Sequence, residues 1–393
     1  MTSALSKSRK DYDVNGEMKD SRTTGENERR TLRRDPHPHL FRSLTIRSVT
    51  TRNRIMLSPM CQYSAQEGLP NEWHLVHLGA RAVGGTGIVF TEAVHTEPAG
   101  RITKHCLGLW NNKQRDALKR IAGFIAQNGA VPAIQLGHAG RKASVGRPWE
   151  GTGPVSPEDG GWPIVGASPM PYAKGFPIPK ELSKAGIERN IQNMVASVIR
   201  ARDAGFQIIE LHAAHGYLFH QFLSPLSNTR IDEYGGTFEN RIKFLLDSID
   251  AVRSEWPNNL PLFVRLSATD WVEGGWDLDD SLRLCRILRQ RGDVDLIDCS
   301  SGGNDPRQQI PIHPAYQTEF SQTIKRDTGL LTASVGLING PDLAEAIIAN
   351  QWSDLVALGR TLMSDPHWPL RAANVLKHES DLWPSQYERS NIF

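Results

Sequence analysis

The sequence predicts an α/β protein, a (β/α)8 TIM barrel of eight parallel strands. Two observations carry this prediction. Short apolar runs alternate with amphipathic stretches eight times along the chain, and such alternation requires parallel strands joined by helical crossovers. Eight units are the number that closes a barrel, whereas an open doubly wound sheet would carry a G-x-G-x-x-G motif after its first strand, and this chain does not.

Composition excludes several other classes of protein. The 393 residues are 39% hydrophobic and 22% charged with a formal net charge of +2, which is typical of globular proteins and gives no sign of nucleic-acid binding. No apolar run approaches the roughly 20 residues that a membrane helix needs. The four cysteines form no C-x-x-C pair, so we expect no disulfide framework, no structural zinc site and a reducing, cytoplasmic location. They are Cys61, Cys106, Cys285 and Cys299.

The chain divides into a tail and one domain. Residues 1–38 are expected to be disordered, because their charged and hydroxyl side chains leave too little apolar surface to offset the entropy of ordering. Residues 39–393 are expected to form the barrel, including a C-terminal tail at 380–393. An excursion after the third strand, residues 137–181, is crowded with Gly and Pro. A loop of this length is usually functional, so we expect it to cap the active site.

Helical spacing and stop residues define the elements of the first half. Leu118, Ile121 and Ile125 share one helical face, and Gly129 ends that helix. The apolar runs between the helices read as buried strands. The elements expected before residue 137 are strands 54–57, 87–92 and 131–136 and helices 74–83 and 113–128.

The second half repeats the alternation. Asp277 can cap a helix that Gly292 ends, and Pro341 stands near the start of another. Helical spacing from Ile187 onwards gives one more helix, which Gly205 ends. The elements expected here are a strand starting at 207, strands 262–266, 296–300, 331–335 and 355–358, and helices 187–204, 240–256, 277–291 and 341–350.

Two histidines and a tyrosine stand at the carboxyl end of the fourth strand, in the stretch His212-Ala-Ala-His215-Gly-Tyr217. Barrel enzymes place their chemistry at such strand ends. Two imidazoles can donate hydrogen bonds to one oxygen, and a phenol can donate a proton beside them. The alternative is that one histidine caps the next helix and the other packs in the core, but the position at a strand end favours a catalytic role.

Small residues and one cation follow the last two strands. Backbone N–H groups at Gly336 and Gly359, with the charge of Arg360, would suit a phosphate, although both glycines could simply make tight turns. The strand ends carry no carboxylates to accompany the histidines. No metal site is therefore expected.

Two further strand residues suit a flat ring attached to that phosphate. Gln135 could hydrogen-bond a ring carbonyl and a ring N–H, and Arg265 would stabilise an anion that develops on the ring. The alternative for Arg265 is a structural ion pair with Glu210 or Glu92.

From about Leu40 to Phe393 the chain resembles the Old Yellow Enzyme family of FMN-dependent ene reductases, especially its thermophilic-like, YqjM-type subgroup. So many motifs in the right order make a chance resemblance implausible. The motifs are SPMCQY at 58–63, QLGHAGRK at 135–142, HAAHGY at 212–217, SPLSNTR at 224–230, DEYGG at 232–236 and QYER at 386–389.

The resemblance implies noncovalent FMN, with NAD(P)H as the reductant. It implies that His212 and His215 hold the oxygen of the substrate, that Tyr217 donates the proton, and that Tyr63 and Lys142 line the substrate site. In this subgroup a C-terminal arginine, here Arg389, reaches the site of the neighbouring subunit in a homodimer or homotetramer. The cofactor contacts that the resemblance implies are Pro59, Met60, Cys61, Ala93, Gln135, Arg265, Gly302, Gly336, Gly359 and Arg360, with Cys61 tuning the flavin potential.

The implied activity is reduction of the C=C bond of α,β-unsaturated carbonyl or nitro compounds. Hydride passes from flavin N5 to one carbon of the alkene, and Tyr217 protonates the other. Two alternatives remain open: a flavoenzyme of the same fold specialised as a biosynthetic isomerase or oxidase, and a flavin-free barrel lyase that acts on a phosphorylated substrate. Neither a nucleic acid nor a membrane is expected as a partner.

Overall fold

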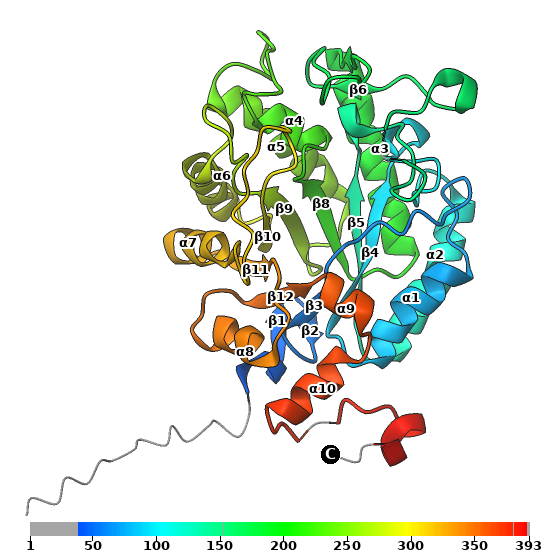
Figure 1. Ribbon diagram of the computed structural model, residues 1–393, viewed down its shortest axis with the longest axis vertical. Helices are drawn as coiled ribbons and strands as arrows, with labels where there is room; N and C mark the ends of the chain where they lie inside the picture. Colours follow the sequence, from blue (N-terminus) through cyan, green and yellow to red (C-terminus); the bar gives the residue numbers. More distant parts are fainter. Residues whose placement is uncertain (1–37, 152, 380, 391–393) are drawn as a thin grey trace, which may run out of the picture. The chain divides into compact units, whose positions relative to one another are not determined.

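A closed barrel of eight parallel strands forms the centre of the domain, as the sequence predicts (Figure 1). The computed structural model describes residues 38–151, 153–379 and 381–390, so the tail expected at 1–38 lies outside the described residues except for Pro38. Pairing of the last barrel strand with the first closes the ring. In order along the chain the barrel strands are β3 (Ile55–Leu57), β4 (Ile88–His95), β5 (Val131–Gly137), β8 (Ile208–Ala213), β9 (Leu262–Ser267), β10 (Leu296–Ser300), β11 (Leu331–Val335) and β12 (Leu355–Leu358).

The long helices surround the barrel, and all of them except α7 and α8 begin at a side-chain cap. The Asn111 side chain accepts a hydrogen bond from the backbone N–H of Gln114, whose Oε1 accepts one from the backbone N–H of Asn111. Asp277 accepts from the backbone N–H of Asp280. Gly292 ends the helix that Asp277 starts, in the left-handed conformation at φ 70°. These helices are α1 (Glu72–Val83), α2 (Asn112–Gln127), α3 (Lys184–Asp203), α5 (Phe238–Glu255), α6 (Leu278–Arg291), α7 (Thr318–Thr328) and α8 (Pro341–Ala349).

Several elements were not expected from the sequence. An antiparallel hairpin, β1 (Leu44–Ile46) and β2 (Val49–Thr51), precedes the barrel. Its buried residues Ile46 and Val49 pack against inward-facing barrel residues such as Met56, so the hairpin closes one end of the barrel core. Helix α7 was also missed, as were α4 (Leu218–Leu223), α9 (Arg360–Ser364), α10 (Trp368–Val375), and the 3-10 turns η1 (His39–Phe41), η2 (Pro98–Gly100) and η5 (Ser385–Ser390).

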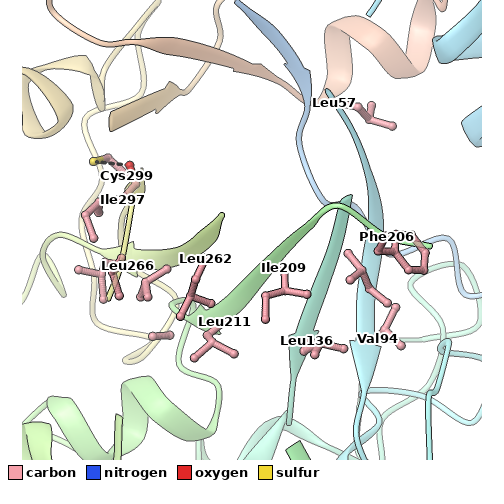
Figure 2. Close-up of a cluster of buried hydrophobic side chains, with 14 of the residues drawn as sticks. Leu57, Val94, Leu136, Phe206, Ile209, Leu211, Leu262, Leu266, Ile297 and Cys299 are labelled. Carbon is pink, nitrogen blue, oxygen red and sulfur yellow. Dashed lines mark hydrogen bonds between the residues drawn. The ribbon is translucent and has the colours of Figure 1, made fainter. Parts of the chain in front are cut away.

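Alternate residues of each barrel strand divide between two layers. On β8, Ile208 belongs to the apolar cluster inside the barrel, whereas Ile209 and Leu211 belong to the cluster between the barrel and the helices. Figure 2 shows part of this outer cluster, with Ile209 and Leu136 on neighbouring strands. Because side chains alternate, Glu210 and His212 share the inward face with Ile208. The polar residues of the central strand therefore lie above an apolar barrel floor.

The excursion after β5 has structure of its own. Two short parallel strands, β6 (Val165–Gly166) and β7 (Lys180–Glu181), pair within it, and it also contains η3 (Gly140–Lys142) and η4 (Pro157–Asp159). Arg230 anchors its base by donating from Nη1 to the carbonyls of Ala167 and Leu182, at 3.0 and 2.7 Å. Among the described helices, none is both long and apolar enough to cross a bilayer.

Candidate active site

The two histidines and the tyrosine at the end of β8 form one cluster of rings. The ring centroids of His212 and His215 lie 5.0 Å apart, those of His212 and Tyr217 4.9 Å, and those of His215 and Tyr217 6.4 Å. His215 adopts a left-handed backbone at φ 59°, followed by Gly216 at φ 71°. A Cβ on Gly216 would stand 2.3 Å from the carbonyl oxygen of Gly303, so only glycine fits this turn.

Both imidazoles are neutral. Burial, with the nearby charge of Arg265, lowers the pKa of His212 and of His215 well below the usual value. The backbone N–H of Ala214 donates to Nδ1 of His212 at 3.4 Å, which leaves the proton of the neutral ring on Nε2. Nε2 of His215 lies 2.6 Å from Oγ of Ser300, which fixes that ring. Neither histidine caps a helix, so the alternative considered from the sequence is wrong on that point.

The phenol of Tyr217 lies near an amine, a thiol and a second phenol. Burial, together with nearby Cys61 and Tyr63, raises the pKa of Tyr217 well above its usual value, so the hydroxyl keeps its proton. Nζ of Lys142 lies 5.3 Å from the centre of the Tyr217 ring. The same amine donates to the carbonyl oxygens of His215 and Gly303, both at 2.8 Å. Burial lowers the pKa of Lys142 to about 7.

The segment after β3 forms another wall of this cluster. Cys61, Tyr63 and Tyr217 are partly buried against one small apolar cluster. The ring of Tyr63 meets that of Trp149 edge-on, with the ring centroids 6.0 Å apart. The excursion therefore reaches the end of the barrel that carries Tyr63 and Tyr217. Pro59 and Met60 are partly buried in the same segment.

Four polar side chains line the inner face of the barrel below the rings. Gln135 donates to Oε1 of Glu210 at 2.7 Å, and strand register places Ala93 beside Gln135. Ala93 was expected after the second strand but lies within β4, which continues to His95. Nε of Arg265 lies 3.3 Å from Oδ2 of Asp298.

The expected ion-pair partner of Arg265 was wrong. Glu92 instead lies 3.2 Å from Nε2 of His74, and Glu210 binds Gln135. Asp298 is the partner because β9 and β10 pair in a register that sets it directly beside Arg265. The separation suits an ion pair, but the angle leaves Nε of Arg265 without a hydrogen bond to a described residue. A buried cation is therefore available to a group placed over the barrel mouth.

The glycines after the last two strands open into a common cavity. This cavity, of about 170 Å³, is lined by Gly336, Gly359, Arg360, Arg265 and Ser300. A Cβ on Gly336, which has φ 125°, would stand 2.9 Å from Cε1 of Tyr316, and one on Gly359 would stand 3.3 Å from Sδ of Met60. Sequence reasoning missed other lining residues, which lie before α7, after β11 and in α9: Tyr316, Gln317, Leu337, Asn339 and Thr361.

Of the remaining expected residues, Arg389 lies apart from these groups, whereas Gly302 is linked to His215 through the hydroxyl of Ser267. Arg389 is exposed on η5, which contacts the start of α10 through the rings of Tyr387 and His367, 6.1 Å apart. Gly302 acts in the turn after β10, where its carbonyl accepts a hydrogen bond from Ser267 at 2.8 Å. Among the described residues, no group of three or more metal-binding side chains converges.

Comparison with known proteins gives consistent matches. The model of the NADH:flavin oxidoreductase / NADH oxidase family matches residues 39–379. An NADPH dehydrogenase of Geobacillus thermodenitrificans (strain NG80-2) is 43% identical over 352 residues, covering 89% of this chain and 98% of that protein. An NADH:flavin oxidoreductase of Gibberella zeae is 43% identical over 355 residues, covering 86% of each chain. The solved structure of morphinone reductase has a TM-score of 0.73 at 24% identity, over 87% of this chain and 91% of that chain.

Proposed function

Since the chain belongs to the NADH:flavin oxidoreductase / NADH oxidase family and is an NAD(P)H-dependent oxidoreductase of the Old Yellow Enzyme type, we propose that it reduces the C=C bond of electron-poor alkenes at the cluster of His212, His215 and Tyr217. FMN is the cofactor and NAD(P)H the reductant. Family membership sets aside the flavin-free lyase that the sequence left open.

The residues present fit an FMN molecule. The cavity behind Gly336 and Gly359 can take a phosphate, with Arg360 supplying charge-assisted hydrogen bonds. Arg265 also lines that cavity, and its Nε makes no hydrogen bond to a described residue. In this proposal the ring lies among Pro59, Met60, Cys61, Ala93, Gln135 and Arg265. Bound FMN supplies two-electron chemistry, by which a hydride from NAD(P)H reaches an electron-poor carbon.

His212 and His215 hold the oxygen that activates the alkene. When hydride adds to the β-carbon, negative charge develops on the α-carbon of the same double bond and spreads to the carbonyl or nitro oxygen. A neutral ring with Nε2–H on His212 can donate to this oxygen without first losing a proton. Donors that are already fixed before charge develops stabilise the transition state without further reorganisation.

Tyr217 supplies the proton. Its raised pKa keeps the hydroxyl protonated, and its ring lies 4.9 Å from that of His212. Because the Tyr217 hydroxyl lies beside the oxygen that the two histidines hold, it can protonate the α-carbon of the alkene while the β-carbon receives hydride. Lys142 supports this arrangement, because it holds the carbonyl of His215 and lies over the Tyr217 ring. Tyr63 and Trp149 limit access of water from the side of the excursion.

The convergence of the three rings carries this proposal. Its test is an anaerobic titration of the FMN-loaded protein. NADPH should bleach the flavin absorbance, and 2-cyclohexenone should then restore it in proportion to the enone added. A flavin that NADPH reduces but that no enone or nitroalkene reoxidises would leave the family activity intact and contradict ene reduction. That second outcome would favour the isomerase or oxidase alternative.

A further inference from the structure

A pair of thiols lies beside the proposed substrate site. Cys61 is partly buried and packs with Tyr63 and Tyr217, whereas Cys106 is fully buried. The backbone N–H of Ala65 donates to the carbonyl of His105 at 2.9 Å, so the two cysteine-bearing segments run side by side. Cys61 packs against the small apolar cluster that contains Cys106, and each thiol shifts the pKa of the other. The sequence did not predict this contact, because the two cysteines lie far apart along the chain.

An imidazole stands next to the inner thiol. The end of β4 pairs with the segment after Cys106: His95 N–H donates to the carbonyl of Leu107 at 3.0 Å, and Leu109 N–H donates to that of His95 at 2.9 Å. The ring of His95 lies at Cys106 and is only 2% exposed. Neither ring nitrogen makes a hydrogen bond of good geometry to a described residue. The flavin mechanism proposed above assigns no role to this buried base.

The surroundings distinguish the two sulfurs. Burial would raise the pKa of Cys106, but its contacts with Cys61 and His95 outweigh burial and hold that pKa well below the usual value. The backbone N–H of Thr103 also donates to its sulfur at 3.3 Å. The contact with Cys106, followed by burial, raises the pKa of Cys61. Cys106 is thus the sulfur that ionises first, and Cys61 belongs to the less buried of the two residues.

We propose that Cys61 and Cys106 form a peroxide-reactive pair that closes reversibly into a disulfide at the edge of the substrate site. The oxidant is a hydroperoxide, and a small dithiol reverses the reaction. Closure would tie the segment that carries Tyr63 to the segment that follows β4.

The reaction balances with the groups present. The Cys106 thiolate takes the proton of Cys61, and the Cys61 thiolate attacks the hydroperoxide, which leaves Cys61 as a sulfenic acid and releases water or an alcohol after proton uptake. Cys106 then passes its proton to His95 and attacks the Cys61 sulfur. The S–S bond forms as hydroxide leaves, and that hydroxide takes the proton from His95 to give a second water. Both thiols are oxidised, and one peroxide is reduced.

The other two cysteines provide an internal control. Cys285 and Cys299 are fully buried in the outer core, and burial raises the pKa of each. Since neither combines access with an ionised neighbour, we expect both to remain thiols.

The test uses FMN-loaded protein, freed of reductant and treated with about one equivalent of hydrogen peroxide. Thiols counted after denaturation should fall from four per chain by two, and dithiothreitol should restore them. Trypsin separates the two cysteines into residues 55–81 and 105–113, and these peptides should appear linked in the oxidised sample. Four surviving thiols, or a link that involves Cys285 or Cys299, would overturn the proposal.

Two variants test whether Cys106 is the partner of Cys61. Cys106→Ser should lose one thiol at most, and more slowly than the wild type because the acceptor of the Cys61 proton is gone; dimedone should trap the Cys61 sulfenic acid that does form. The control Cys285→Ala should still lose two. A reversible loss of two thiols in Cys106→Ser would contradict the pairing. The linked peptide of the wild-type protein decides the question even if Cys106→Ser does not fold. This test does not depend on whether the enzyme reduces enones.

Discussion

Different neighbours hold the rings of the two histidines at the end of β8. A backbone N–H fixes the proton of His212 on Nε2, while Ser300 holds the ring of His215. Because burial keeps the pKa of both rings well below the usual value, their donors do not depend on protonation in the neutral pH range. Substrate activation should therefore come from fixed N–H groups and not from an imidazolium.

Substitution of His212 by alanine tests this assignment. We expect reoxidation of the reduced enzyme by 2-cyclohexenone to slow by about 100-fold or more, since a donor aimed at developing charge is lost. FMN affinity should stay close to that of the wild type. Stopped-flow absorbance measures the rate, and His313→Ala, at an exposed site, is the control. A variant that kept near-normal enone turnover would show that His212 is not an oxyanion donor.

Tyr217 should act in one half-reaction only. In Tyr217→Phe the aromatic ring remains but the proton is missing, so we expect slow reoxidation by enones and an unchanged rate of flavin reduction by NADPH. Rapid mixing resolves the two steps. Tyr234→Phe is the matched control, because that hydroxyl donates to Asp247 away from the site. Equal losses in both half-reactions of Tyr217→Phe would contradict its role as proton donor.

Residue identity alone could not give every partner in the site. The sequence marked Arg265 and both histidines because each stands at a strand end. It offered Glu210 or Glu92 as the partner of Arg265, but the ion pair is with Asp298. That choice depends on the register between β9 and β10, which follows from barrel closure and not from local sequence.

At the scale of elements, the turns after β11 and β12 shape the cavity that we propose for the phosphate. Gly336 combines a positive φ of 125° with side chains that a Cβ would meet within 3.1 Å. A larger residue there must displace Tyr316 or Gln317, both of which line the cavity. The turn therefore needs glycine for reasons that do not involve the catalytic rings.

We expect Gly336→Val to weaken FMN binding by about tenfold or more, from the strain of overpacking and of the left-handed backbone. Quenching of FMN fluorescence during titration of the apoprotein gives the dissociation constant. Gly340→Ala is a suitable control, since its φ is −94° and a Cβ there meets nothing within 4 Å. Unchanged FMN affinity in Gly336→Val would place the phosphate elsewhere.

The bounds of helices for which the sequence shows clear capping residues were predicted closely. Helix α6 begins after Asp277 and ends at Gly292, as the capping residues indicate. Helix α7 was missed because its N-cap, Gln317, makes no side-chain capping hydrogen bond and the preceding loop carries no helical pattern. The β1–β2 hairpin is too short for an alternating pattern to stand out, and its burial comes from the barrel end that it covers.

On the scale of the whole molecule, the C-terminal segment carries an arginine that lies away from the catalytic cluster of its own chain. Arg389 is exposed on η5, and its own chain brings no described catalytic residue to it. We propose that it completes the site of a neighbouring subunit in a homodimer or homotetramer.

Mixed oligomers test that proposal. Tyr217→Phe and Arg389→Ala subunits should each be impaired alone, but a co-expressed mixed dimer should regain one site with both residues intact and recover about half of the wild-type turnover per dimer, by counting intact sites. Tandem affinity tags isolate the mixed species, and enone reduction is the readout. If Arg389 served only its own subunit, the mixed dimer would regain nothing.

The origin of the two hydrogens added to the alkene tests the central claim most directly. With NADPH deuterated at C4 in ordinary water, NMR of the reduced enone should show deuterium on the β-carbon alone. With unlabelled NADPH in D2O, deuterium should appear on the α-carbon, which Tyr217 protonates after exchanging its own proton with solvent. Cofactor deuterium on the α-carbon, or solvent deuterium on the β-carbon, would contradict an oxygen held by the two histidines with a phenol beside it.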